Sequence, residues 1–243
     1  MSPLNASAEA SPTVRTRDVR AAAVIAGAGT LAMAVFGIFG NVAIITLIGD
    51  GATGVSDRIA DGALLLRGAI VAFLIVAILD VVLAWAIMRF FGATRHGGLP
   101  VLAGWLRVAY AAVLAAAVGS LGVALSSVSA TGGDPDAAYP ALVAFQSTWQ
   151  FGLIVFAAHL VVLGALLVRD AATPTWLGSI IVTAGCSYAF DGVARVFLEQ
   201  HSPVLLVSTV AVAATSIVGE VGLGLWFLTR GGRQPAARHA GRR

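Results

Sequence analysis

Six long apolar runs, separated by short polar segments, dominate the chain. Each run reaches the roughly 20 residues that an α-helix needs to cross about 30 Å of hydrocarbon. The pattern therefore predicts an all-α fold, a polytopic transmembrane bundle of six helices. The approximate spans are residues 21–49, 68–88, 101–125, 141–168, 175–198 and 204–229.

Prolines and the two chain ends complete this pattern. Pro100, Pro140, Pro174 and Pro203 stand at the starts of spans three to six, and no proline falls inside a span. Because proline is tolerated in the first turn of a helix, this placement predicts unbroken helices. Residues 1–20 lack apolar periodicity and predict a flexible cytoplasmic tail. Residues 230–243 predict a second, Arg-rich cytoplasmic tail.

Composition agrees with a membrane protein and excludes several chemistries. The 243 residues are 58% hydrophobic and 11% charged, whereas soluble domains carry about 25% charged residues. Lysine is absent, which excludes a lysine Schiff base and a P-loop. The net charge of +3 does not indicate binding of nucleic acid, and the single Cys186 excludes an intrachain disulfide.

The arginines predict the orientation of the spans. In a six-span arrangement, eleven arginines fall on the side of the two termini and only Arg58 and Arg67 on the other. Loops and tails rich in arginine stay in the cytoplasm, so both termini are expected there. We predict a multi-pass protein of the plasma (inner) membrane.

Four ionisable residues, each in a different span, form what we call the inner polar layer: Asp80, Arg107, His159 and Glu220. At a rise of 1.5 Å per residue, they lie about 10–15 Å from the predicted cytoplasmic ends of their spans. Charged side chains at such a depth are costly and face a partner or a polar cavity. Arg107 stays charged and needs a carboxylate, which Asp80 or Glu220 can supply. The remaining charge is offset if His159 protonates or if one carboxyl holds a proton.

The inner polar layer admits three interpretations. It is an ion-pair network that only fixes helix packing, a polar cavity for a proton, an ion or a small ligand, or a metal site. A single imidazole supplies too few nitrogen ligands for a transition metal, and Arg107 would repel a cation, so no metal site is predicted. No catalytic residue is assigned, because neither a set of several histidines nor a serine–histidine pair stands in the spans.

A second group lies toward the opposite face and forms the outer polar stripe, Tyr188, Asp191 and Arg195. Asp191, Arg195 and Glu199 are spaced i, i+4 and i+8, so consecutive members are neighbours along one side of a helix. The spacing predicts an ion pair between Asp191 and Arg195 within their own helix.

The order of the polar residues resembles a bacterial integral membrane family, domain of unknown function 4386, over most of residues 20–230. The residues that carry the resemblance are Asp80, Trp105-Leu-Arg107, His159-Leu-Val-Val-Leu-Gly164, Trp176-Leu-Gly178, Tyr188-x-x-Asp191, Gly219-Glu220 and Leu225-Trp226. The resemblance implies a membrane fold of about six helices without an assigned activity. It also implies that Asp80, Arg107, His159, Asp191 and Glu220 form the polar pattern of the family.

Two functions follow as hypotheses, and an enzyme ranks behind both. The first is binding or transport of a proton or small polar ligand at the inner polar layer. The second is a structural or accessory membrane protein whose buried ion pairs only fix helix packing. The predicted partners are the lipid bilayer and the proton or ligand, without nucleic acid and without a cofactor. The sequence leaves a homo-oligomer open.

Overall fold

The computed structural model describes residues 12–92, 97–128, 133–199 and 202–233. Within these ranges the chain is helical and contains no strand. The six long helices are α1 (Pro12–Ile48), α3 (Ala63–Phe91), α4 (Leu99–Ser127), α5 (Ala138–Arg169), α6 (Thr175–Phe197) and α7 (Pro203–Thr229). All six have the length and apolar composition to cross a membrane, so the predicted all-α, six-helix fold is confirmed.

The helices extend beyond the apolar runs that predicted them. α1 begins at Pro12, inside the segment expected to be a flexible tail, and α3 covers Ala63–Phe91 where the run suggested 68–88. An apolar run marks only the hydrocarbon layer, whereas a helix continues through the polar headgroup regions on both sides. Residues 1–11 and 234–243 of the predicted tails lie outside the described residues, as do Arg95 and His96.

Two short elements lie in connections that the apolar pattern left as loops. α2 (Val55–Asp61) follows α1, and the 3-10 turn η1 (Pro135–Ala137) precedes α5. The two are close, since the Ser56 hydroxyl donates to the carbonyl of Pro135 at 3.0 Å. α2 buries Val55 and Ile59, one turn apart, against the end of the bundle. This end is called the α2 end below.

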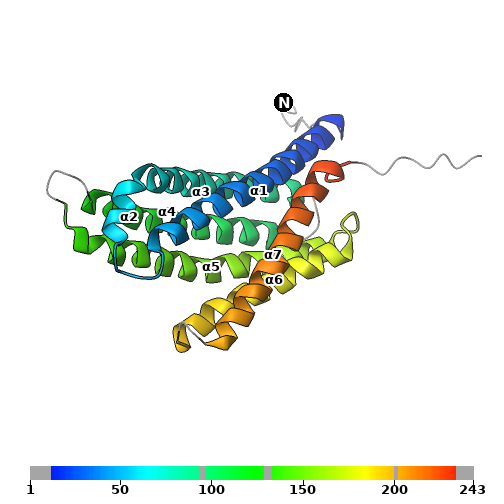
Figure 1. Cartoon of the computed structure of the whole chain (residues 1–243). Coiled ribbons are helices and arrows are strands. Elements are labelled where there is room, and N and C mark those ends of the chain that lie inside the picture. The colour runs from blue at the N-terminus through cyan, green and yellow to red at the C-terminus, as the bar shows by residue number, and fades with distance from the viewer. Residues whose placement is uncertain (1–11, 93–96, 129–132, 200–201, 234–243) are drawn as a thin grey trace, which may run out of the picture.

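The six long helices close into a ring. Each packs against its neighbour in the chain, and α7 returns to pack against α1. Figure 1 shows α1 and α7 side by side at the end where α1 begins. This opposite end of the bundle, which carries the start of α1 and the end of α7, is called the termini end below.

Arg20 holds the first and last helices together at the termini end. Its Nη1 donates to the carbonyls of Phe227 at 2.9 Å and Gly231 at 2.7 Å, and its Nη2 donates to the carbonyl of Leu228. The last carbonyls of a helix lack partners within the helix and carry partial negative charge, so a guanidinium suits them. Arg20 therefore caps α7 from α1.

We expect Arg20→Met to lower the free energy of unfolding by about 1–2 kcal/mol, because three carbonyls lose a charged donor and only water replaces it. Equilibrium unfolding in SDS mixed micelles would measure the change. Arg89→Gln serves as the control, since Arg89 pairs with Asp18 at the exposed surface of the same end and such pairs contribute about 0–1 kcal/mol. Equal losses in the two variants would contradict the capping role.

Glycines bring the backbones of α5 and α6 close together. A Cβ added at Gly164 would lie 2.7 Å from the backbone nitrogen of Val182 and 2.8 Å from the carbonyl oxygen of Gly178. A Cβ at Gly185 would lie 2.8 Å from the carbonyl oxygen of Ala157. Small residues at helix crossings are typical of membrane bundles, where van der Waals packing between backbones supplies much of the association.

Candidate functional site

The centre of the bundle holds an ion pair between α3 and α4. Asp80 is 0% exposed and Arg107 is 4% exposed, and Nε of Arg107 lies 2.9 Å from Oδ1 of Asp80. The contact is close but lacks hydrogen-bond direction, and neither oxygen of Asp80 has a hydrogen-bond donor within the described residues. Of the two carboxylates that the sequence offered to Arg107, Asp80 is therefore the one in contact.

His159 of α5 accepts a hydrogen bond from Arg107. Nε2 of His159 lies 3.0 Å from Nη1 of Arg107, and Nδ1 lies 2.8 Å from the carbonyl oxygen of Ala103. A guanidinium only donates and a carbonyl only accepts, so Nε2 is unprotonated and Nδ1 carries the hydrogen. These two contacts fix His159 as the neutral imidazole. Protonation of His159, one of the two ways expected to offset charge in this layer, would break its bond to Arg107.

A thioether and an aromatic ring also contact the guanidinium. Nη2 of Arg107 lies 3.5 Å from Sδ of Met33 on α1, and Cζ lies 5.4 Å from the ring centroid of Phe156 on α5. The Phe156 ring is stacked with His159 and tilted against Tyr110. A cation over an aromatic face gains about 0.5–2 kcal/mol, the more so when water is excluded. Each of the three guanidinium nitrogens of Arg107 therefore contacts a side chain of the protein.

Glu220 of α7 stands apart from this network. It interacts electrostatically with Arg107 and Asp80, so the structure brings all four residues of the inner polar layer into one region. Its side chain is only partly buried, and it makes no hydrogen bond or ion pair within the described residues. The Tyr188 hydroxyl of α6 interacts with it electrostatically. Asp80 and Arg107 neutralise each other and His159 is neutral, so an ionised Glu220 leaves one net negative charge.

The outer polar stripe forms a second cluster, between α6 and α7. Nε of Arg195 donates to Oδ2 of Asp191 at 2.7 Å, the pair that the i, i+4 spacing predicts. Two hydroxyls of α7 extend it. Ser208 donates to Oδ1 of Asp191 at 2.5 Å, and Nη2 of Arg195 donates to the Thr209 hydroxyl at 2.6 Å. The charges of this stripe are therefore balanced and hydrogen-bonded.

Glu199 and Tyr188 lie differently from the predicted stripe. α6 ends at Phe197, so Glu199 lies beyond the helix, exposed, and is not the next member of the row. Tyr188 turns toward the centre of the bundle, with its ring edge-on to Phe156 at 5.7 Å between centroids. Tyr188 therefore lies between the two polar groups, since its hydroxyl interacts electrostatically with both Glu220 and Asp191.

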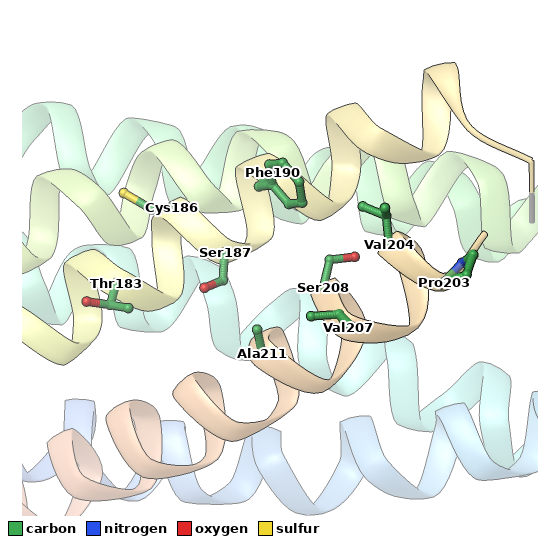
Figure 2. A pocket seen from close by; sticks show the side chains of 9 residues that line it. All are labelled: Thr183, Cys186, Ser187, Phe190, Pro203, Val204, Val207, Ser208 and Ala211. Carbon is green, nitrogen blue, oxygen red and sulfur yellow. The ribbon is translucent and has the colours of Figure 1, made fainter.

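A groove of about 580 Å³ opens between α6 and α7 beside the outer stripe. Figure 2 shows Phe190 of α6 with Val204 and Val207 of α7 along it, and the hydroxyls of Ser187 and Ser208 between the two helices. The Ser208 hydroxyl already donates to Asp191. The groove is therefore mostly apolar and presents no free charged group, which leaves Glu220 as the stronger candidate for ligand chemistry.

Sequence reasoning missed several members of both clusters. Met33 and Phe156 lie in apolar runs and carry no sequence signal for a contact with a buried cation. Ser208 and Thr209 form a polar pair inside a Val- and Leu-rich run, and that interruption marks the side of α7 that meets Asp191. Within the described ranges, no group of three His, Cys, Asp or Glu side chains is arranged to hold a metal ion.

The fold and these buried charges define a polytopic membrane protein with an interior polar layer. The chain belongs to the family described as Domain of unknown function (DUF4386), whose model matches residues 25–231. It is also similar to a protein of Archaeoglobus fulgidus described as an uncharacterized protein, with 32% identity over 92 residues. That match covers 37% of this chain, and the chain spans half the length of that relative. No solved structure matches the chain.

Proposed function

We propose that this protein binds, and moves across the membrane, a proton or a small polar ligand at the inner polar layer. Glu220 is the group that takes up and releases it. The observation that carries the proposal is the environment of Glu220, a partly buried carboxyl without a hydrogen bond or ion pair in the described part of the chain. An intramembrane acid of this kind is typical of ion and proton pathways.

The charges around Glu220 favour a positive occupant. Asp80 neutralises Arg107 through their 2.9 Å contact, and the hydrogen bonds of His159 keep its ring neutral. Binding a proton, or a small ligand that carries a positive charge, removes the one net negative charge that an ionised Glu220 leaves. A low dielectric environment strengthens this attraction.

The proposed orientation places both termini in the cytoplasm. Arg17, Arg20 and Arg89 lie at the termini end, whereas Arg58 lies at the α2 end. This distribution supports the positive-inside arrangement. The occupant of Glu220 would then exchange with the cytoplasm through the termini end.

We expect Glu220→Gln to remove the proton or ligand exchange while leaving the bundle folded, because glutamine keeps the shape and loses only the titrating oxygen. Infrared difference spectra of the purified protein between acidic and alkaline buffers would report the carboxyl of Glu220 as a band absent from the variant. Proton flux into liposomes, driven by an imposed membrane potential and read by an internal pH dye, would test transport.

The matched control is Glu199→Gln, which removes an exposed carboxyl that lies outside the helices. We expect this variant to keep both signals. If Glu220→Gln behaves like the unmodified protein in the infrared and flux experiments alike, the proposed role of Glu220 is wrong.

A second candidate function is structural, and the environment of Arg107 favours it. Nε, Nη1 and Nη2 of Arg107 contact Asp80, His159 and Met33, so each nitrogen of the guanidinium is already engaged by the protein. In this alternative the ion pair only sets the packing of α3, α4 and α5. It predicts that a packing variant with no charge at positions 80 and 107 keeps the cellular role of the protein.

A further inference from the structure

The two arginines at the α2 end have opposite environments. Arg58 donates to the carbonyls of Leu47 at 2.9 Å and Ile48 at 2.6 Å, and so caps the end of α1. Arg67, in the second turn of α3, is exposed and makes no hydrogen bond or ion pair within the described residues. Among the described residues of this end, Arg67 is therefore an arginine whose guanidinium is unpaired.

An apolar groove of about 630 Å³ runs beside Arg67 between α1 and α3. Arg67 and Gly68 lie among its lining residues, and Gly68 has no side chain to narrow it. Its apolar lining comes from two faces, Val35, Phe36 and Phe39 of α1, and Leu64, Val71 and Ile75 of α3. The site thus combines an apolar groove on the side of the bundle with one unpaired guanidinium.

The depth of Arg67 places this cation at a membrane boundary. Residue 77 is the midpoint of α3 (Ala63–Phe91), and Arg67 lies about 15 Å from it along the helix axis. Half of a hydrocarbon layer is also about 15 Å thick. The groove then continues from Arg67 toward Ile75, about 12 Å into the hydrocarbon. In a bilayer centred on residue 77, the phosphate groups of the lipids would lie just outside the level of Arg67.

We propose that this groove binds one phospholipid of the leaflet at the α2 end, with an acyl chain along α1 and α3 and the phosphate on Arg67. A guanidinium presents two parallel N–H groups that match a phosphate, and this fork is stronger than a point charge. The exposed Asp50, Asp57 and Asp61 at the same end disfavour a headgroup of net negative charge. The phosphate of a zwitterionic lipid such as phosphatidylethanolamine fits this charge pattern.

The proposal concerns a surface on the α1–α3 side and is independent of Glu220. Its test is native mass spectrometry of the full chain released from detergent, after titration with phosphatidylethanolamine or with a diacylglycerol of the same acyl chains. We expect one phosphatidylethanolamine to be retained and the diacylglycerol, which lacks phosphate, to be retained more weakly. Because Arg67→Gln removes the charged hydrogen bonds to the phosphate, we expect it to lower phosphatidylethanolamine retention by about ten-fold or more.

Two variants separate the charge from the groove. Val71→Trp fills the groove from a side chain that is 54% exposed, so we expect it to remove retention while Arg67 remains. Arg230→Gln removes an exposed arginine at the termini end and should retain the lipid as the unmodified protein does. Arg67→Lys, which keeps the charge without the fork, should lose less retention than Arg67→Gln.

Several results would overturn the proposal. These are unchanged retention in Arg67→Gln, equal losses in Arg67→Gln and Arg230→Gln, or equal retention of diacylglycerol and phosphatidylethanolamine. A dimer that forms without lipid and is lost in Val71→Trp would show that a second copy occupies the groove, and would overturn it as well. If Val71→Trp does not fold, the three arginine variants decide the outcome.

Discussion

Replacing Asp80 alone with leucine is expected to lower the free energy of unfolding by about 3–5 kcal/mol, because it leaves a buried guanidinium without its carboxylate. Asp80 and Arg107 lie 2.9 Å apart in the centre of the bundle, and both are buried. Arg107 cannot lose its charge, and its other contacts, His159 and Met33, are neutral. Unfolding in SDS mixed micelles would measure the loss.

The reverse replacement, Arg107→Met, is expected to cost less than Asp80→Leu. A carboxyl left alone in an apolar environment can take up a proton and become neutral, whereas a guanidinium cannot release one. The double variant Asp80→Leu/Arg107→Met removes both charges together, and replacing a buried pair by apolar residues is often close to neutral. We therefore expect it to be more stable than either single variant. A loss below about 1 kcal/mol in Asp80→Leu would contradict the assignment of Asp80 as the partner of Arg107.

Gly164→Leu is expected to cost about 3 kcal/mol, because a side chain there has no free space. A Cβ at this position would already lie 2.7 Å from the backbone nitrogen of Val182 and 2.8 Å from the carbonyl oxygen of Gly178. Backbone atoms cannot rotate away as a side chain can, so α5 and α6 would have to separate. The same unfolding experiment measures the change.

Gly119→Leu is the matched control for Gly164→Leu. Gly119 lies within α4, and apart from the local backbone of α4 itself no atom would come within 4 Å of an added Cβ. A glycine-to-leucine replacement at such a position removes the helix-destabilising flexibility of glycine, so we expect it to be neutral or slightly stabilising. If the two variants lose equal stability, the close α5–α6 crossing is not the cause.

The sequence predicted the six spans because hydrocarbon imposes a length and a composition that no other environment demands. The first and last residues of each helix were harder to predict from the sequence. α1 was expected from residue 21, but the helix begins at Pro12. The added segment contains Arg20, which donates to carbonyls at the end of α7. A contact between the first and last helices has no local sequence signal. α2 was missed because its seven residues are too few for an apolar period to emerge from a loop.

The sequence predicted the depth of the candidate site residues in the membrane, but not which of them contact one another. Counting residues from the ends of the spans placed Asp80, Arg107, His159 and Glu220 at one level, and the structure brings all four into one region. Depth alone could not choose between Asp80 and Glu220, because the choice depends on the rotation of each helix. The neutral state of His159 depends on the carbonyl of Ala103, a backbone group that no residue type reveals.

The Arg20 contact also bears on how the chain is assembled during synthesis. α1 leaves the ribosome before the other five long helices described above, yet part of its surface is completed only by α7, which follows the other four in the chain. A nascent chain that lacks α7 has an open seam along α1 and no acceptor for the guanidinium of Arg20. The insertion machinery or a chaperone in the membrane would have to shield that seam until α7 is inserted. Truncation before residue 203 should accordingly yield a protein that is inserted but rapidly degraded.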